Sequence, residues 1–340
     1  KVIHERPLDV LEVDGNIIQM EVRDHYAYLL TSTELTVVDF SNPRDLKKVS
    51  QVGLPISYVR DPDMAVTPDA VYIAAFDLYV VTELFSESPV FSTVDRYWTA
   101  RSVSVFGESL WVLKTTNWVP TSQCMYECYD IRDPGNPTLI SRVESRGDPA
   151  SLLARGDSLI VAGGESGVGI FDISDPETPN PVHCLHPFGF ASDVLYDHER
   201  LFVRNDIPNA EFFSLYNRSL CRPHENDSTP VTIPVGTDTC DFAVFDLTSA
   251  EEPILVGRYE HPGFSREIYR EGNTVWVRGM VGNIRTLTLA SNGRIIEGPL
   301  LKAPGEPSSV SVHNGLLMTG SDYAEDLFFY DVSDPLQPKF

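Results

Sequence analysis

The sequence predicts an all-β protein, and more specifically a seven-bladed β-propeller made of four-stranded blades. Two observations support this fold class. A short motif of strand, aspartate, turn and proline recurs along the 340 residues, and no segment shows the periodicity of a helix. Two further strand-like segments, joined by a short polar turn, precede each copy. Repeat units of about 42 residues with four strands each are typical of propeller blades.

The motif is clearest in GIFDISDPETPNPV, Gly169 to Val182. A run of β-branched and aromatic residues predicts a strand, and the aspartate after it can accept backbone N–H bonds and close a turn. Proline then fixes φ where the next, outermost strand begins. The motif aspartates are Asp39, Asp130, Asp172, Asp246 and Asp331, and two degenerate copies centre on Thr82 and Thr288. We expect these aspartates to cap turns in preference to binding calcium.

Seven units follow from this alignment, and we expect residues 1–340 to form a single domain. Blades are predicted to start near residues 7, 55, 98, 148, 189, 263 and 305. The last unit ends at Phe340 without most of its fourth strand. The opening KVIHERPLD resembles KKVSQVGLP, the predicted fourth strand of the first blade. We therefore expect residues 1 to about 6 to complete blade 7 and close the ring, which leaves no open sheet edge there.

The copy LTVVDFSNP, Leu35 to Pro43, together with HYAYLL before it, resembles the LVIVD-repeat family of β-propellers. The resemblance extends over nearly the whole chain and is strongest in five of the blades. It implies a propeller fold. It also implies an extracellular, cell-surface or periplasmic location, because members are mostly secreted or surface-associated bacterial and archaeal proteins. Most members have no established activity, so the resemblance implies no particular chemistry.

The charge of the chain excludes some classes of partner. There are 26 basic and 49 acidic side chains, which give a net charge of −23 and a pI near 4.6. Such a chain repels nucleic-acid phosphates and anionic lipid headgroups, so we expect no nucleic-acid partner. It contains no run of 18 apolar residues, so we expect no membrane insertion.

Five cysteines are present, and two of them suggest a disulfide. Cys221 and Cys240 bracket a polar segment rich in Pro, Asn and Asp, which a disulfide would stabilise. Cys124 and Cys128 lie in a predicted strand, roughly 13 Å apart at the rise of an extended chain, too far to pair with each other. We expect a Cys221–Cys240 bond in an oxidising compartment.

Two long insertions mark the face on which we expect function. They span residues 114–124 in blade 3 and 205–238 in blade 5, and each joins the second strand of its blade to the third. Loops in this position share one face of a propeller, and insertions on a rigid scaffold often carry function.

The predicted binding site is the polar mouth of the channel on that face. LHPFGFASD and YEHPGFSRE are near copies at neighbouring blade junctions. Together with the aligned junctions they supply the candidate ligand-binding residues Tyr58, Arg101, His186, Asp193, His261, Arg266 and Glu267. Three interpretations remain open. These side chains pair with one another and with channel water, or they bind an anionic small molecule or sugar, or they catalyse a lyase reaction on an acidic carbohydrate.

No metal-binding motif such as HxH or HExxH is present, so we expect no cofactor. Calcium or another divalent metal on the acidic surface is the remaining alternative.

The sequence favours a secreted or periplasmic binding or interaction module that presents its inserted loops to a protein or a carbohydrate. Two alternatives stay open: an enzyme acting on an acidic carbohydrate at the channel mouth, and a structural subunit of a cell-surface assembly. An exposed apolar patch on the insertions would favour the assembly.

Overall fold

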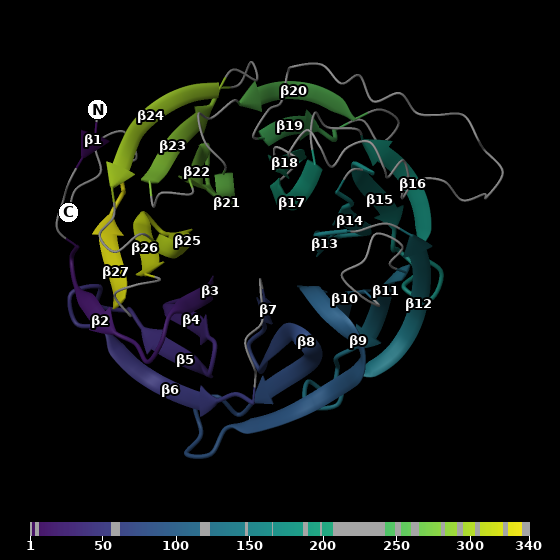
Figure 1. The fold of residues 1–340 in the computed structure, drawn as a ribbon, viewed down its shortest axis with the longest axis horizontal. Coiled ribbons are helices and arrows are strands. Elements are labelled where there is room, and N and C mark those ends of the chain that lie inside the picture. The colour runs from purple at the N-terminus through teal and green to yellow at the C-terminus, as the bar shows by residue number, and fades with distance from the viewer. Residues whose placement is uncertain are drawn as a thin grey trace. The chain divides into compact units, whose positions relative to one another are not determined.

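The computed structural model describes most of the chain, and its regular secondary structure is entirely β (Figure 1). The described residues are 2–3, 7–55, 62–115, 123–146, 149–164, 166–185, 190–197, 199–206, 242–248, 253–259, 265–279, 283–290, 295–302, 307–321 and 326–334. They form two compact units, residues 1–95 with 265–340, and residues 96–264. Each unit is a series of antiparallel sheets, as the four-stranded repeat predicts.

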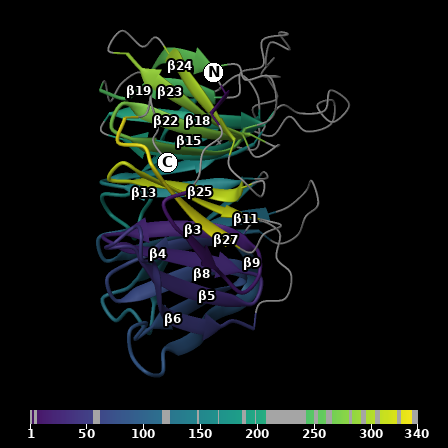
Figure 2. The same ribbon diagram turned by 90° about the vertical axis from the view of Figure 1, so that its left-hand side faces the viewer.

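The first unit contains the two ends of the chain. Its sheets appear in Figure 2, where β3 to β6 follow one another in order. The first sheet comprises β3 (Ile17–Arg23), β4 (Tyr26–Thr31), β5 (Glu34–Asp39) and β6 (Lys47–Gly53). Then come β7 (Asp63–Val66), β8 (Ala70–Thr82) and the start of β9 (Val90–Phe106). Another sheet comprises β21 (Ser265–Glu271), β22 (Thr274–Gly279), β23 (Asn283–Leu289) and β24 (Ile295–Lys302).

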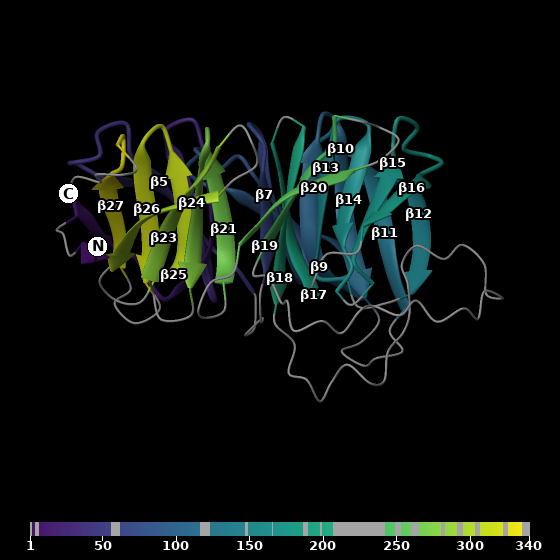
Figure 3. The ribbon, with the colours of Figure 1, turned by 90° about the horizontal axis from the view of Figure 1, so that it is seen from above.

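The last sheet of this unit is completed from the other end of the chain. It contains β25 (Pro307–His313), β26 (Leu316–Ser321) and β27 (Asp326–Asp331), which lie side by side in Figure 3, and β2 (Val10–Glu12) beyond β27. We call these four strands the C-terminal sheet. Val10 pairs with Phe328 and Glu12 with Asp326 in an antiparallel register.

This pairing corrects the predicted position of the closing strand. Residues 1 to about 6 were expected to complete the last blade, but β1 (Val2–Ile3) instead pairs in parallel with β24. The strand that completes the C-terminal sheet is β2. Packing explains the choice: Val13, which follows β2, is 1% exposed and lies in a core cluster with Met318, Leu327 and Phe329. The sequence analysis had given the closing role to residues 1–6, which resemble the fourth strand of the first blade. That segment lacks the apolar spacing of Val10, Leu11 and Val13.

The second unit holds three sheets of the same design. One is the continuation of a six-stranded sheet that begins with β7 and β8, and it contains the remainder of β9 with β10 (Ser109–Thr115), β11 (Gln123–Asp130) and β12 (Thr138–Arg146). The next contains β13 (Ser151–Arg155), β14 (Ser158–Ala162), β15 (Val168–Asp172) and β16 (Asn180–Leu185). The third contains β17 (Phe190–Asp197), β18 (Arg200–Asp206), β19 (Phe242–Asp246) and β20 (Ile254–Tyr259). Apolar clusters lie between neighbouring sheets, for example Trp111 and Tyr126 against Leu152 and Phe171.

The motif aspartates cap turns, as predicted. Asp39 Oδ1 accepts the N–H of Ser41 at 2.8 Å, directly after β5. The four other motif aspartates accept the N–H of the second residue after them at 2.9–3.0 Å, and these are Asp130, Asp172, Asp246 and Asp331. The backbone N–H of Ser174 holds the pKa of Asp172 below its ordinary value, since the bond favours the ionised carboxylate.

Removal of residues 1–13 is expected to lower the free energy of unfolding by at least about 3 kcal/mol. The deletion removes β2 and the buried Val13, and burial of an aliphatic side chain contributes about 1.5–3 kcal/mol. It also leaves β27 as an open edge. Denaturant unfolding measures this in the full chain, in the chain without residues 1–13 and in a chain without residues 1–6. Removal of residues 1–6 alone should cost much less, and equal losses for the two truncations would contradict the assignment of β2.

Candidate functional site

The structure describes three of the seven predicted ligand-binding side chains. Arg101 and Asp193 belong to the unit of residues 96–264, and Glu267 belongs to the other unit. Arg266 lies in β21, but its side chain is outside the described part. Tyr58, His186 and His261 also lie outside the described residues, so their convergence on a site stays a prediction.

Asp193 and Glu267 occupy the same structural position in their sheets. A β-bulge interrupts the pairing of the first and second strands, and each of these residues is the first to pair after the bulge. Bulges at the same place occur in three other first strands, where the corresponding residues are also polar: Gln19, Ser102 and Ser309. A bulge redirects the side chains beside it, so this repeated position can aim a polar group away from its own sheet.

In the second unit the polar groups at this position join neighbouring first strands. Ser151 of β13 donates its hydroxyl to Asp193 Oδ1 of β17 at 3.1 Å. Ser102 Oγ of β9 accepts the N–H of Leu152 of β13 at 3.1 Å. Arg101 donates from Nη1 to the carbonyl of Pro149 at 3.4 Å. Both described candidates of this unit therefore contribute to contacts between sheets.

Glu267 does the same in the first unit. Its Oε2 atom accepts the Nε–H of Arg278 at 3.0 Å and the backbone N–H of Val310, on the neighbouring β25, at 3.2 Å. Arg278 is 8% exposed and also donates to the carbonyl of Pro307 at 3.0 Å. For the three described side chains, these bonds support the first of the three interpretations, in which the polar groups pair with one another and with the scaffold.

Sequence reasoning missed the arginines that face the bulge position. Arg278 pairs across the strands with Glu267, and Arg204 pairs across the strands with Asp193. The signal was present, because the segments LFVRN and TVWVRG place an arginine at matching distances from the turn before them. Counting residues outward from each hairpin turn identifies both pairs.

A carboxyl group on β3 has unusual acidity. The pKa of Glu21 is raised from 4.5 to about 8, mainly by burial and further by the carboxylates of Asp63 on β7 and Glu267 on β21. A carboxyl group in such surroundings favours its neutral form, since ionisation would add charge to a poorly solvated, acidic environment.

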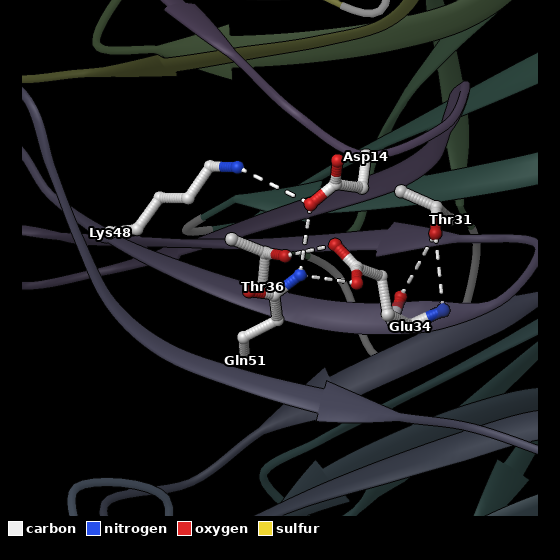
Figure 4. A network of polar contacts seen from close by, with 6 residues as sticks. All are labelled: Asp14, Thr31, Glu34, Thr36, Lys48 and Gln51. Carbon is white, nitrogen blue, oxygen red and sulfur yellow. Dashed lines mark hydrogen bonds and ion pairs between the residues drawn. The ribbon is translucent and has the colours of Figure 1, made fainter.

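A second polar network fixes the segment between β2 and β3 to the first sheet (Figure 4). The Gln51 amide donates to Glu34 Oε2 at 2.6 Å and to Asp14 Oδ2 at 3.1 Å. Thr36 donates to Glu34 Oε1 at 2.7 Å, and Lys48 Nζ lies 3.6 Å from Asp14 Oδ2. Glu34 is only 8% exposed, and each of its carboxylate oxygens accepts a bond. The network therefore holds the start of the first sheet next to the closing strand.

A buried ion pair joins β10 and β11, the two strands that the insertion of residues 114–124 connects. Lys114 Nζ is 2.6 Å from Glu127 Oε2, and both side chains are 1% exposed. Tyr129 donates to the same carboxylate oxygen at 2.6 Å, and Arg142 Nε donates to Oε1 at 2.7 Å. Since the carboxylate is fully bonded, this network can hold the β10–β11 hairpin rigidly.

Both insertions leave from hairpins that are paired close to the loops. Thr115 pairs with Cys124 near the end of the β10–β11 hairpin, and Arg204 pairs with Phe242 near the end of the β18–β19 hairpin. Most of each insertion lies outside the described residues. The bases of the two loops are thus fixed by regular strand pairing.

The cysteines divide into two groups. Cys124 and Cys128 are buried free thiols, and burial raises the pKa of Cys128 to about 11, which makes it unreactive at neutral pH. Cys221 and Cys240 lie outside the described residues, and the bond between them stays a prediction. Cys184 lies in β16, so a non-reducing peptide map has to test it as an alternative partner for either of them.

Within the described ranges, no group of three histidine, cysteine, aspartate or glutamate side chains could hold a metal ion. The same part of the chain has no helix that is long and apolar enough to cross a membrane.

Glu127→Ala is expected to lower the free energy of unfolding by roughly 3–5 kcal/mol, because it leaves the Lys114 ammonium in the core without its carboxylate. Denaturant unfolding measures the loss. The double variant Lys114→Met with Glu127→Leu removes both buried charges and should lose much less. A single variant as stable as the wild type would contradict the role of this pair.

Glu21→Gln should change how stability depends on pH. The pKa of Glu21 is higher in the folded chain, about 8, than in the unfolded chain, so its contribution to stability is present at pH 4 and is lost as pH rises towards 8. The glutamine variant should match the wild type at pH 4. At pH 9 it should be more stable by roughly 2 kcal/mol, a value reduced for the partial exposure of the group. Thermal unfolding at both values tests this, with exposed Glu87→Gln as the matched control; a variant with the pH profile of the wild type would refute it.

The comparisons with known proteins agree with this architecture. Residues 14–52 match the family model of the LVIVD repeat, and this range contains all six residues of the network in Figure 4. A search of curated proteins found no match in sequence. Among solved structures, a chain from the crystal structure of the mitotic checkpoint complex is similar with a TM-score of 0.64 at 11% identity, covering 97% of this chain and 92% of that chain. The computationally designed protein Ika8 is similar with a TM-score of 0.59 at 10% identity, covering 95% and 99%.

At such low identity these two likenesses concern the fold alone. The chain carries an LVIVD repeat, and repeats of this family are typical of β-propeller proteins.

Proposed function

We propose that this chain is a seven-bladed β-propeller that works as a binding or interaction module. The blade count follows from dividing the six-stranded sheet. We place a turn at Phe76, which has a positive φ of 65° in the middle of β8, so that β7, the two halves of β8 and the start of β9 make one four-stranded blade. The rest of β9 with β10–β12 makes the next blade. With the five other sheets this gives seven.

The observation that carries the architectural proposal is the pairing of β2 with β27. In a propeller, a strand from the start of the chain can complete the last sheet. The ring is then closed without an exposed sheet edge. In the proposed ring, residues 10–12 take the closing role that the sequence analysis gave to residues 1–6.

The proposal of an interaction module rests on the hydrogen bonds that the described candidate residues form. Arg101, Asp193 and Glu267 bond to neighbouring sheets, which favours a scaffold over a lyase-like active site built from them. The insertions 114–124 and 205–238 both start from paired hairpins. Both connect a second strand to a third, so they leave their sheets at equivalent ends. We assign the partner, a protein or a carbohydrate, to this face.

The location and the cofactor requirement belong to the same proposal. The net charge of −23 and the LVIVD repeat support an extracellular, cell-surface or periplasmic protein. Recognition through loops requires no cofactor. A structural calcium or another divalent metal would stabilise the scaffold without taking part in binding.

Replacing both insertions with short glycine-containing turns tests the proposal. The variant should keep its β-sheet circular dichroism and its cooperative unfolding, because the hairpin bases remain. It should lose the binding of whatever partner the wild type retains from the secreted or envelope fraction of the source organism. Quantitative mass spectrometry of the retained proteins and glycans measures this.

Arg101→Ala serves as the control for the enzyme alternative. This variant should retain the partner, since the proposed contact lies on the loops. Cleavage of polygalacturonate oligomers by the wild type, abolished in Arg101→Ala, would contradict the interaction module and favour an enzyme. A partner retained equally by the wild type and the loop-replaced variant would contradict the assigned face.

A further inference from the structure

Three aromatic rings meet on the surface of the first unit, and we call them the aromatic strip: His25, Tyr26 and Phe85. The ring centroids of His25 and Tyr26 are 4.1 Å apart with an interplanar angle of 39°. Those of Tyr26 and Phe85 are 4.9 Å apart with an angle of 47°. Phe85 is 53% exposed, and His25 is also exposed, whereas Tyr26 packs in part against the core. The strip therefore offers ring surface to a ligand from a fixed base.

The position of Phe85 departs from the repeat. In the other sheets with a motif aspartate, the second residue after it is exposed and polar, and these residues are Ser41, Arg132, Ser174, Thr248 and Ser333. The connection from β8 to β9 has one extra residue, Glu83, with a φ of 54°. Leu84 consequently fills the buried place, at 4% exposure, and Phe85 takes the exposed place of the serines.

An exposed phenylalanine at this point contributes little to folding. The buried position in the turn is already filled by Leu84, and a serine serves the exposed position in three other sheets. Tyr26 lies on the neighbouring sheet, at a place after the turn where Ser109 and Ser158 stand in the β9–β10 and β13–β14 hairpins and Leu316 stands in the β25–β26 hairpin. The departure at Phe85 thus places an exposed ring beside that of Tyr26, and the two adjacent sheets share one aromatic surface.

The charges around the strip favour a cationic ligand. Asp24 precedes His25, and its side chain is 77% exposed. Glu83 and Glu87 flank Phe85 in sequence and are exposed. The pKa of Asp39 is lowered, first by the backbone N–H of Ser41 and to a smaller extent by His25, so this carboxylate also lies near the strip.

The basic side chains here are themselves beside carboxylates. Arg23 lies 4.0 Å from Asp24, and Lys47 lies 3.3 Å from Asp45. With a net charge of −23 for the chain, the field at the strip attracts cations and repels anionic sugars.

We propose that the aromatic strip binds an arginine or lysine side chain of a basic partner protein. The cation would lie over the face of Phe85 and Tyr26, where the π electrons attract it, and the surrounding carboxylates would add charge complementarity. The β3–β4 turn lies at the opposite end of its sheet from the loop that joins the second strand to the third, so within its own unit the strip is separate from loops of the inserted kind.

A fluorescein-labelled hexa-arginine peptide is the probe, and fluorescence anisotropy at 150 mM salt measures its dissociation constant. Phe85→Ser restores the serine of the other sheets, so this variant should fold normally. It should bind the peptide about three- to thirtyfold more weakly, which corresponds to the range of a cation–π contact. Phe85→Leu should weaken binding similarly, because leucine keeps an apolar surface but has no π face. Phe85→Trp should bind at least as tightly as the wild type.

Phe106→Ser is the matched control, since Phe106 is 46% exposed at the β9–β10 turn, outside the aromatic strip. It reports the non-specific attraction of the peptide to the acidic chain and should leave the dissociation constant within about twofold of the wild type. Equal weakening in Phe106→Ser and Phe85→Ser, or no weakening in either, would overturn the proposal. Full binding by Phe85→Leu would also overturn it. So would binding of neutral maltohexaose that Phe85→Ser abolishes while the peptide binds unchanged, because the strip would then be a carbohydrate site.

Discussion

The rest of the structure depends on one pairing of strands, that of β2 near the N-terminus with β27 near the C-terminus. Without it, β27 would be the open edge of a three-stranded sheet, and the apolar residues around Val13 would lose their cover. The neighbouring contacts all strengthen this junction. Asp9 Oδ2 accepts the N–H of Leu46, directly before β6 of the first sheet, and Leu8 donates its N–H to the carbonyl of Phe329. The network around Glu34 then fixes the segment that leads into β3.

Within each unit, hydrogen bonds between the first strands of neighbouring sheets also hold the sheets together. The apolar contacts between sheets have no preferred direction, so they fix the distance between two sheets better than the alignment of their strands. The bulge-position side chains add direction. Glu267 bonds Val310 on the next sheet, and Ser102 bonds Leu152. A scaffold joined in this way keeps its sheets in fixed register while its loops vary, which suits a module that recognises partners through insertions and surface positions.

Much of the fold could be predicted from the sequence because each copy of the repeat contains local signals for its strands and turns. All five motif aspartates form the expected turns, since the aspartate, the following turn residues and the proline are local signals. The closing strand was misplaced because it depends on which of two short segments buries its apolar side chains against β27. That contact joins residues more than 300 positions apart, and no local pattern specifies it.

The site was harder to predict, for a related reason. Asp193 and Glu267 were named as candidates from two near-copy junctions, but their partners depend on a bulge that comes directly before each of them in its strand. The exposed ring of Phe85 was hidden by an alignment that centred its copy on Thr82 and did not register the extra residue at Glu83. A single inserted residue changes which side chain is buried and which is presented to a partner.

A disulfide introduced across the junction tests the central claim most directly. Glu12 and Asp326 are directly paired and neither is in the core, so cysteines at both positions should form a disulfide under mild oxidation. Non-reducing digestion and mass spectrometry would detect the linked peptides. Cysteines at Ile3 and Asp326 should not link, because Ile3 pairs with Leu301 of β24. The opposite result, a bond from residue 3 and none from residue 12, would show that the chain closes through its first residues and that β2 does not complete the last sheet.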